Sequence, residues 1–96
     1  MSIADDLHEK RPEILRIAAK HHAADVRVFG SVARGDAGPD SDVDLVVRFL
    51  PGATLLHHAA MIRELEAVLG CKVDVVSERG LRDAVRERVL REAAPV

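Results

Sequence analysis

Apolar residues recur at helical spacing in three stretches of the chain, and each stretch predicts a helix. In the first, Pro12 suits an opening turn, a further short helical turn can precede it, and the apolar face is formed by Ile14, Ile17 and Ala18. In the second, Thr54 can cap a helix that stops at Gly70. Its apolar stripe is formed by Leu55, Ala59, Ile62, Leu65 and Leu69. The third runs from about Leu81 to Glu92, with a stripe formed by Val85 and Val89.

Short runs rich in β-branched residues predict three strands, at residues 26–29, 43–47 and 72–76. Residues 30–41 lie between the first two and are rich in Gly, Ser, Asp and Pro, which predicts a loop with room for one helical turn. The predicted order is therefore helix, strand, loop, strand, helix, strand, helix, an α/β domain whose helices cover a small sheet. The helix between the second and third strands permits a parallel crossover, although antiparallel pairing also fits the pattern.

Length and composition narrow the class of protein. The 96 residues predict one domain, residues 1–96, with little chain left for a separate module that binds an acceptor. A net charge of −2 argues against a protein that coats nucleic acid, and an aromatic content of 2% argues against a base-stacking surface. No signal peptide and no apolar run near the ~20 residues of a membrane span are visible. We therefore expect a soluble cytoplasmic protein, in which the single cysteine, Cys71, is a small buried side chain.

Three aspartates are the candidate metal ligands. Asp42 and Asp44 are separated by one residue at the start of a predicted strand, so their side chains point the same way and repel each other. A divalent cation removes the repulsion, and oxygen ligands favour Mg²⁺ or Mn²⁺. Asp74 lies in the apolar third strand, and if the two strands are neighbours it can point to the same place. Three carboxylates there predict a two-metal site, whereas two aspartates at a strand edge are also compatible with simple exposure to solvent.

The dipeptide Gly30-Ser31 is the candidate phosphate site. At the end of a strand, Gly and Ser allow backbone N–H groups and a hydroxyl to approach phosphate oxygens. Arg34 is near enough in sequence to contact a phosphate as well. The alternative is a tight turn in which Arg34 pairs with Asp36 or Asp40.

Two further groups of polar residues have less specific interpretations. Five arginines fall in the last fifth of the chain, interleaved with acidic residues: Arg79, Arg82, Arg86, Arg88 and Arg91. They predict either a solvated helix face with local ion pairs or a docking surface for an acidic partner. The adjacent pairs His21-His22 and His57-His58 chelate metals poorly on a helix, because neighbouring side chains diverge by about 100°. We interpret these histidines as surface or interface residues.

In combination, three segments resemble the minimal nucleotidyltransferase family, the small-domain branch of the polymerase-β-like superfamily. The segments are Gly30-Ser31-Val32-Ala33-Arg34-Gly35, Ser41-Asp42-Val43-Asp44-Leu45-Val46-Val47, and Asp74. The resemblance implies the nucleotidyltransferase fold, a small mixed sheet flanked by helices. It also implies Mg²⁺-dependent binding of ATP, with two ions, and transfer of AMP with release of pyrophosphate.

The resemblance also implies roles for six residues. Asp42, Asp44 and Asp74 would ligate the metals, and Asp74 would help to deprotonate the attacking hydroxyl. Gly30 and Ser31 would hold the triphosphate, and Arg34 would contact a phosphate or brace the loop. These are expectations carried over from the family onto matching positions.

Small members of this family are similar to the antitoxin half of toxin–antitoxin pairs. The toxin there is a helical HEPN ribonuclease, and some antitoxins attach AMP to one of its tyrosines. The resemblance thus implies a HEPN-family partner and no direct contact with nucleic acid or membrane. The assembly expected is a hetero-complex or a homodimer. Two alternatives stay open: an antitoxin that acts by binding alone, and a nucleotide-binding subunit of a larger transferase.

Overall fold

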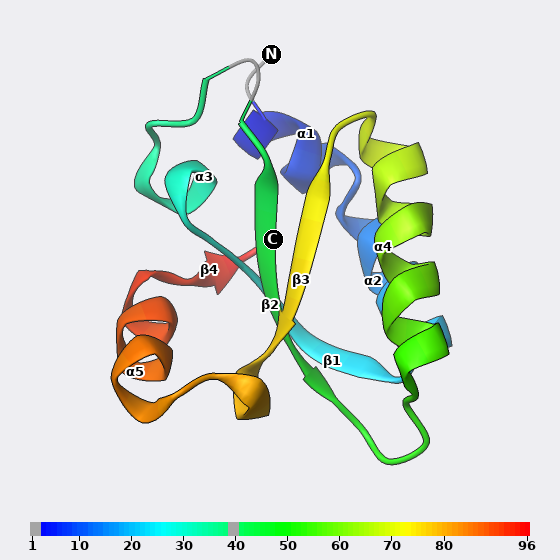
Figure 1. Ribbon diagram of the computed structural model, residues 1–96. Helices are drawn as coiled ribbons and strands as arrows, with labels where there is room; N and C mark the ends of the chain where they lie inside the picture. The colour runs from blue at the N-terminus through cyan, green and yellow to red at the C-terminus, as the bar shows by residue number, and fades with distance from the viewer. Residues whose placement is uncertain (1–2, 39–40) are drawn as a thin grey trace.

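A computed structural model describes residues 3–38 and 41–96 and contains a four-stranded sheet with helices around it (Figure 1). In chain order the elements are α1 (Ile3–Glu9), α2 (Arg11–Lys20), β1 (Ala23–Phe29), α3 (Ser31–Arg34), β2 (Val43–Phe49), α4 (Leu55–Leu69), β3 (Val73–Ser77), the 3₁₀ helix η1 (Glu78–Gly80), α5 (Asp83–Glu92) and β4 (Ala94–Pro95). The predicted mixed sheet with flanking helices is confirmed.

The strands lie in the order β3-β2-β1-β4. β1 is antiparallel to both β2 and β4, whereas β2 and β3 are parallel and are connected through α4. The sequence left parallel and antiparallel pairing open at this point, and the structure settles it as parallel. Because the two strands run the same way, both begin at the same end of the sheet.

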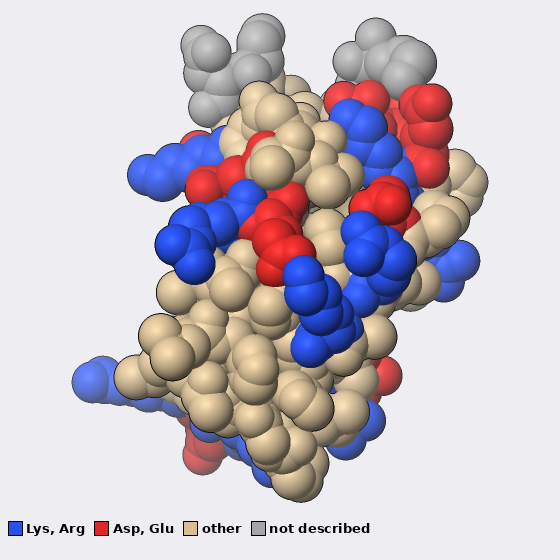
Figure 2. All heavy atoms as spheres, turned by 90° about the vertical axis from the view of Figure 1, so that its right-hand side faces the viewer, with Lys and Arg blue, Asp and Glu red and all other residues tan. Residues whose placement is uncertain are grey.

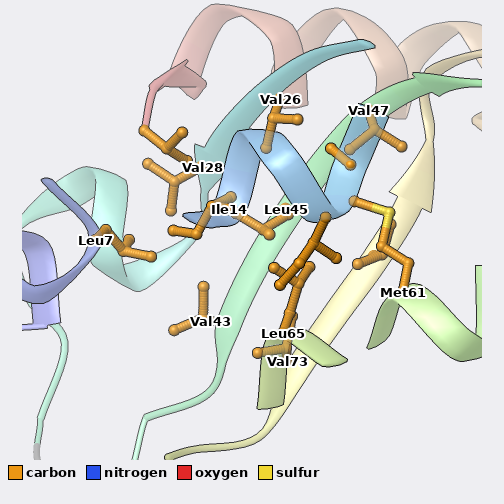
Figure 3. Close-up of a cluster of buried hydrophobic side chains, with 14 of the residues drawn as sticks. Leu7, Ile14, Val26, Val28, Val43, Leu45, Val47, Met61, Leu65 and Val73 are labelled. Carbon is orange, nitrogen blue, oxygen red and sulfur yellow. The ribbon is translucent and has the colours of Figure 1, made fainter. Parts of the chain in front are cut away.

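One face of the sheet packs against α2 and α4. Alternate residues of β2, namely Val43, Leu45 and Val47, are fully buried, and they belong to the same apolar cluster as Ile14 of α2 and Leu65 of α4 (Figure 3). Since side chains alternate along a strand, the residue between Val43 and Leu45 faces the other way. Packing of the core therefore determines the direction of that residue, Asp44.

Three elements differ from the sequence prediction, namely α1, the start of β1, and β4. The short turn expected before Pro12 is a separate seven-residue helix, α1, anchored by buried Leu7. Strand β1 begins at Ala23, three residues early, because the low strand propensity of alanine hid the segment that pairs with the end of β2. Strand β4 contains Pro95, which is tolerated at a sheet edge but weakens any strand signal.

Several side chains depart from the predicted burial. His21 is 6% exposed and its Nε2 pairs with Glu64 of α4, so its interpretation as a surface residue is wrong. Its carboxylate partner is 43 positions away, which no local pattern indicates. Cys71 is half-buried rather than buried, because it lies in the turn after α4. On α5, Val89 is buried but Val85 is 39% exposed, so only half of the predicted stripe faces the core.

Glu64 is expected to stabilise the packing of α2 against α4 in a pH-dependent way. Hydrogen bonds from Lys20 and His21 lower the pKa of Glu64 below its ordinary value of 4.5. A carboxylate with a lowered pKa stabilises the fold above its ordinary pKa, and the stabilisation is lost as the pH falls through the folded-state value. Wild type should therefore melt at a higher temperature than Glu64→Gln at pH 7, and the difference should shrink as the pH falls below the ordinary pKa of 4.5. A difference that stays constant over this range would contradict the assignment; Glu9→Gln, an exposed change on α1, is the control.

None of the helices within residues 3–38 and 41–96 combines the length and apolar character that crossing a membrane requires.

Candidate functional site

Two of the three predicted metal ligands lie side by side on neighbouring strands. Asp44 of β2 is the register partner of Asp74 of β3 in the parallel pair. Register partners on adjacent strands are separated by about 4.8 Å in the hydrogen-bonding direction and share a face of the sheet. Asp42 immediately precedes β2 and is exposed. The condition set by the sequence, that the second and third strands be neighbours, is thus met.

The three carboxylates influence one another electrically. The pKa of Asp44 is raised, first by partial burial and then by the negative charges of Asp74 and Asp42. The positive charge of Arg34 opposes this effect without reversing it. The cluster therefore has an excess of negative charge that a cation would neutralise.

The donor chemistry of this cluster fits a hard divalent ion. All three side chains offer carboxylate oxygen, which Mg²⁺ and Mn²⁺ prefer. In the part of the chain that the structure describes, no three His, Cys, Asp or Glu side chains already converge as a ligand set.

Gly30 brings the backbone against the acidic cluster. It follows β1 with a φ of +76°, a left-handed conformation that glycine adopts without strain. A Cβ at this position would lie 2.5 Å from Asp44 Oδ2, closer than side-chain atoms can approach. Glycine is therefore needed at position 30 for two reasons: the positive φ of the backbone, and the space that the Asp44 side chain occupies.

The donors predicted to bind phosphate hold a carboxylate in this structure. The Gly30 N–H donates to Glu92 Oε1 at 2.7 Å, and Arg34 Nη1 donates to the same oxygen at 2.9 Å. Arg34 Nε also donates to Asp36 Oδ2 at 3.2 Å. The alternative pairing of Arg34 with Asp36 is thus present, while Asp40 lies outside the described residues. Ser31 is half-buried as the first residue of α3, beside Gly30.

Sequence reasoning missed Glu92 as a member of this site. It lies at the end of α5, 62 positions from Gly30, and no spacing rule connects the two. The sequence offered one indication that Glu92 could have a partner, its position among the alternating acidic and basic residues of the last helix. Within that helix, Arg86 pairs locally with Asp83 at 2.7 Å, as a solvated face predicts, whereas Glu92 pairs outside it.

A hollow of about 350 Å³ opens beside the anion-binding donors. It is lined by Phe29, Gly30, Arg34, Arg88, Val89 and Glu92. A larger hollow of about 510 Å³ has none of the predicted site residues in its lining. We place the candidate site at the smaller hollow and the adjoining aspartates, because the predicted anion-binding donors Gly30 and Arg34 line this hollow and Asp44 lies against Gly30.

Comparison with known proteins links this arrangement to a family. The family model described as nucleotidyltransferase domain matches residues 11–96. Protein adenylyltransferase MntA of Thermococcus cleftensis is 42% identical over 72 residues, covering 75% of this chain and 73% of that protein.

Solved structures agree with the family match. A structure provisionally described as a minimal nucleotidyltransferase covers 100% of this chain and 97% of its own, with 53% identity and a TM-score of 0.90. A toxin–antitoxin complex with AMP-PNP contains a chain with a TM-score of 0.74 and 19% identity, covering 86% of this chain and 68% of its own. At that identity the second likeness shows a shared fold.

Proposed function

This chain belongs to the nucleotidyltransferase domain family, and we propose that it transfers AMP from Mg²⁺-bound ATP to a tyrosine hydroxyl of a HEPN-class helical toxin, acting as its antitoxin. Nucleotidyl transfer itself is the activity of the family, and the relative MntA is a protein adenylyltransferase. The observation that carries the proposal is the register of Asp44 with Asp74 beside Gly30. This arrangement supports the proposal, because a metal–triphosphate substrate needs cation ligands and anion-binding donors next to each other.

Each predicted residue has a role in the proposed reaction. Asp42, Asp44 and Asp74 would hold the divalent ions, which neutralise phosphate charge and help to activate the attacking oxygen when bound. The Gly30 N–H, the Ser31 hydroxyl and the Arg34 guanidinium would hold phosphate oxygens. Asp74 would accept the proton of the attacking hydroxyl. The oxygen of the attacking hydroxyl then bonds to the α-phosphorus of ATP, and the bond from that phosphorus to pyrophosphate breaks.

A protein acceptor is favoured by the relatives and by the surface of α4. The neighbour solved with AMP-PNP is itself part of a toxin–antitoxin complex. In this chain Leu55 and Leu56, at the start of α4, are 86% and 82% exposed. Figure 2 shows the face that carries α4, with charged groups towards one end and a broad uncharged area towards the other. Two adjacent exposed leucines at the start of a helix are suited to burial against a partner protein.

Labelled ATP tests the proposal. The purified chain, Mg²⁺ and the helical toxin from the neighbouring reading frame are incubated with ATP labelled on either the α- or the γ-phosphate. The proposal predicts that the toxin retains the α label only and that the γ label leaves with pyrophosphate. Label from the γ-phosphate would show phosphoryl transfer instead, and an unlabelled toxin in a stable complex would exclude transfer to it.

The exposed leucines also favour a second candidate, neutralisation by binding alone. Leu55 and Leu56 lie where α4 begins, after the far end of β2, whereas the carboxylates lie at the start of that strand. A toxin bound there could be masked without any chemistry. In that case Asp42→Asn/Asp44→Asn should neutralise toxin in cells as well as wild type does, and a Leu55→Glu/Leu56→Glu variant should not. Loss of neutralisation in the aspartate variant would exclude this candidate.

A further inference from the structure

The carboxylate of Glu92 occupies the position that the proposed function assigns to a phosphate oxygen. One oxygen, Oε1, accepts hydrogen bonds from the Gly30 N–H at 2.7 Å and from Arg34 Nη1 at 2.9 Å. These are two of the three groups proposed to hold the triphosphate. An oxygen that receives both donors leaves neither of these N–H groups free for a ligand in the same geometry.

The backbone around Glu92 is held on both sides, while its side chain borders open space. Val89, one turn earlier on α5, is buried, and Ala94, two residues later, pairs with Val28 in the sheet. The Glu92 side chain itself is 25% exposed and lines the hollow beside Gly30. A rotation of this side chain towards solvent would release both donors and would need no movement of α5.

Electrostatics make the contact a competition between two anions. The positive charge of Arg34 favours a carboxylate at this position. A triphosphate offers the same donors more negative charge, and its own charge repels Glu92. Only one of the two anions can accept the Gly30 N–H at a time, because a backbone amide has a single proton to donate.

We propose that Glu92 is a built-in competitor of the nucleoside triphosphate, which holds the anion position of Gly30 and Arg34 until a phosphate displaces it. The inference rests on the proposed function, since it takes these two residues as phosphate ligands. Its consequence is that the apparent affinity for the nucleotide is reduced by the fraction of molecules in which Glu92 is bound. Glu92 thus sets the nucleotide concentration at which the site fills.

Calorimetric titration of the full chain with Mg²⁺ and a non-hydrolysable ATP analogue tests this inference. Glu92→Gln keeps an acceptor of similar shape but removes its charge, and it should bind the analogue about three- to tenfold more tightly than wild type. Glu87→Gln removes the same charge from an exposed position of α5, and its affinity should stay within about twofold of wild type. Inorganic tripolyphosphate, which lacks the nucleoside, should show the same order of affinities.

The outcomes separate the two proposals. Equal affinity of wild type and Glu92→Gln overturns the role of Glu92 and leaves the nucleotide site standing. Absence of binding by all three proteins overturns both the role of Glu92 and the proposed function. Should Glu92→Gln fail to fold, wild type labelled with ¹⁵N and ¹³C answers the question. Tripolyphosphate should then shift the amide resonance of Gly30 and the side-chain carboxyl ¹³C resonance of Glu92 together, and a shift of Gly30 without Glu92 overturns the inference.

Discussion

Replacing Asp42 and Asp44 together by asparagine should lower AMP transfer by about a thousandfold or more, because the site loses the charges that hold its cations. The measurement is the initial rate of α-label transfer to the toxin under saturating Mg²⁺ and ATP. The expected loss lies in the rate, since the apolar surface of α4 that we propose for the partner is untouched. Co-purification of variant and toxin should therefore persist.

The same variant should fold at least as stably as wild type. The pKa of Asp44 is raised by burial and by Asp74 and Asp42, so its charged form opposes folding once the pH exceeds the ordinary pKa. Removal of that charge should raise the melting temperature of the metal-free protein above that of wild type at pH 7. A large fall in melting temperature would mean that these carboxylates support the fold instead.

A control for charge alone is available in the same chain. Glu9→Gln/Glu87→Gln removes two negative charges from exposed positions on α1 and α5. Transfer by this variant should stay within about threefold of wild type, because exposed charges outside the site are screened by salt. A comparable loss in both double variants would contradict the assignment of Asp42 and Asp44 to the site.

Gly30→Ala should reduce transfer by about a hundredfold or more and destabilise the fold by about 1–3 kcal/mol. Two causes add: the left-handed backbone is strained for alanine, and the new Cβ would lie 2.5 Å from Asp44 Oδ2. Asp44 must then shift, and shifts of about 1 Å in a catalytic group cost on the order of a hundredfold in rate. Initial rates and chemical denaturation of the same preparation measure the two effects.

Gly35→Ala is a control for a positive φ without crowding. Gly35 has a φ of +79° and a ψ of 15°, in the αL region, and a Cβ there would meet nothing within 4 Å. The ψ of −151° at Gly30 lies in a region that is populated almost only by glycine, so alanine is more strained at Gly30 than at Gly35. Gly35→Ala should cost about 1–2 kcal/mol of stability, while transfer stays within a fewfold of wild type. If both variants lose activity equally, the close approach of Gly30 to Asp44 has no functional part.

Much of the fold could be predicted from the sequence because local signals and packing agree. The apolar runs at β2 and β3 are strands, and Thr54 and Gly70 cap α4 as predicted, Thr54 through a hydrogen bond from the His57 amide. The parallel pairing of β2 with β3 could not be decided, since periodicity shows that a strand exists and not which neighbour it takes. That pairing is what places Asp44 beside Asp74.

The remaining features depend on contacts between distant positions. Glu92 accepts a hydrogen bond from the Gly30 N–H, 62 positions away in the sequence, and Glu64 pairs with the His21 ring, 43 positions away. In both cases the sequence shows an ordinary helical glutamate, and only the packing of one helix against another element reveals its partner. The roles of all six predicted site residues stay predictions, supported by their place in the fold and by the family: Gly30, Ser31, Arg34, Asp42, Asp44 and Asp74.

The mass of the toxin after co-production with this chain in cells tests the central claim most directly. The account predicts that toxin made with wild type gains the mass of one AMP on a tyrosine, and that toxin made with Asp42→Asn/Asp44→Asn keeps its unmodified mass. Unmodified toxin in both preparations, or the same modification in both, would contradict the claim that this site transfers AMP.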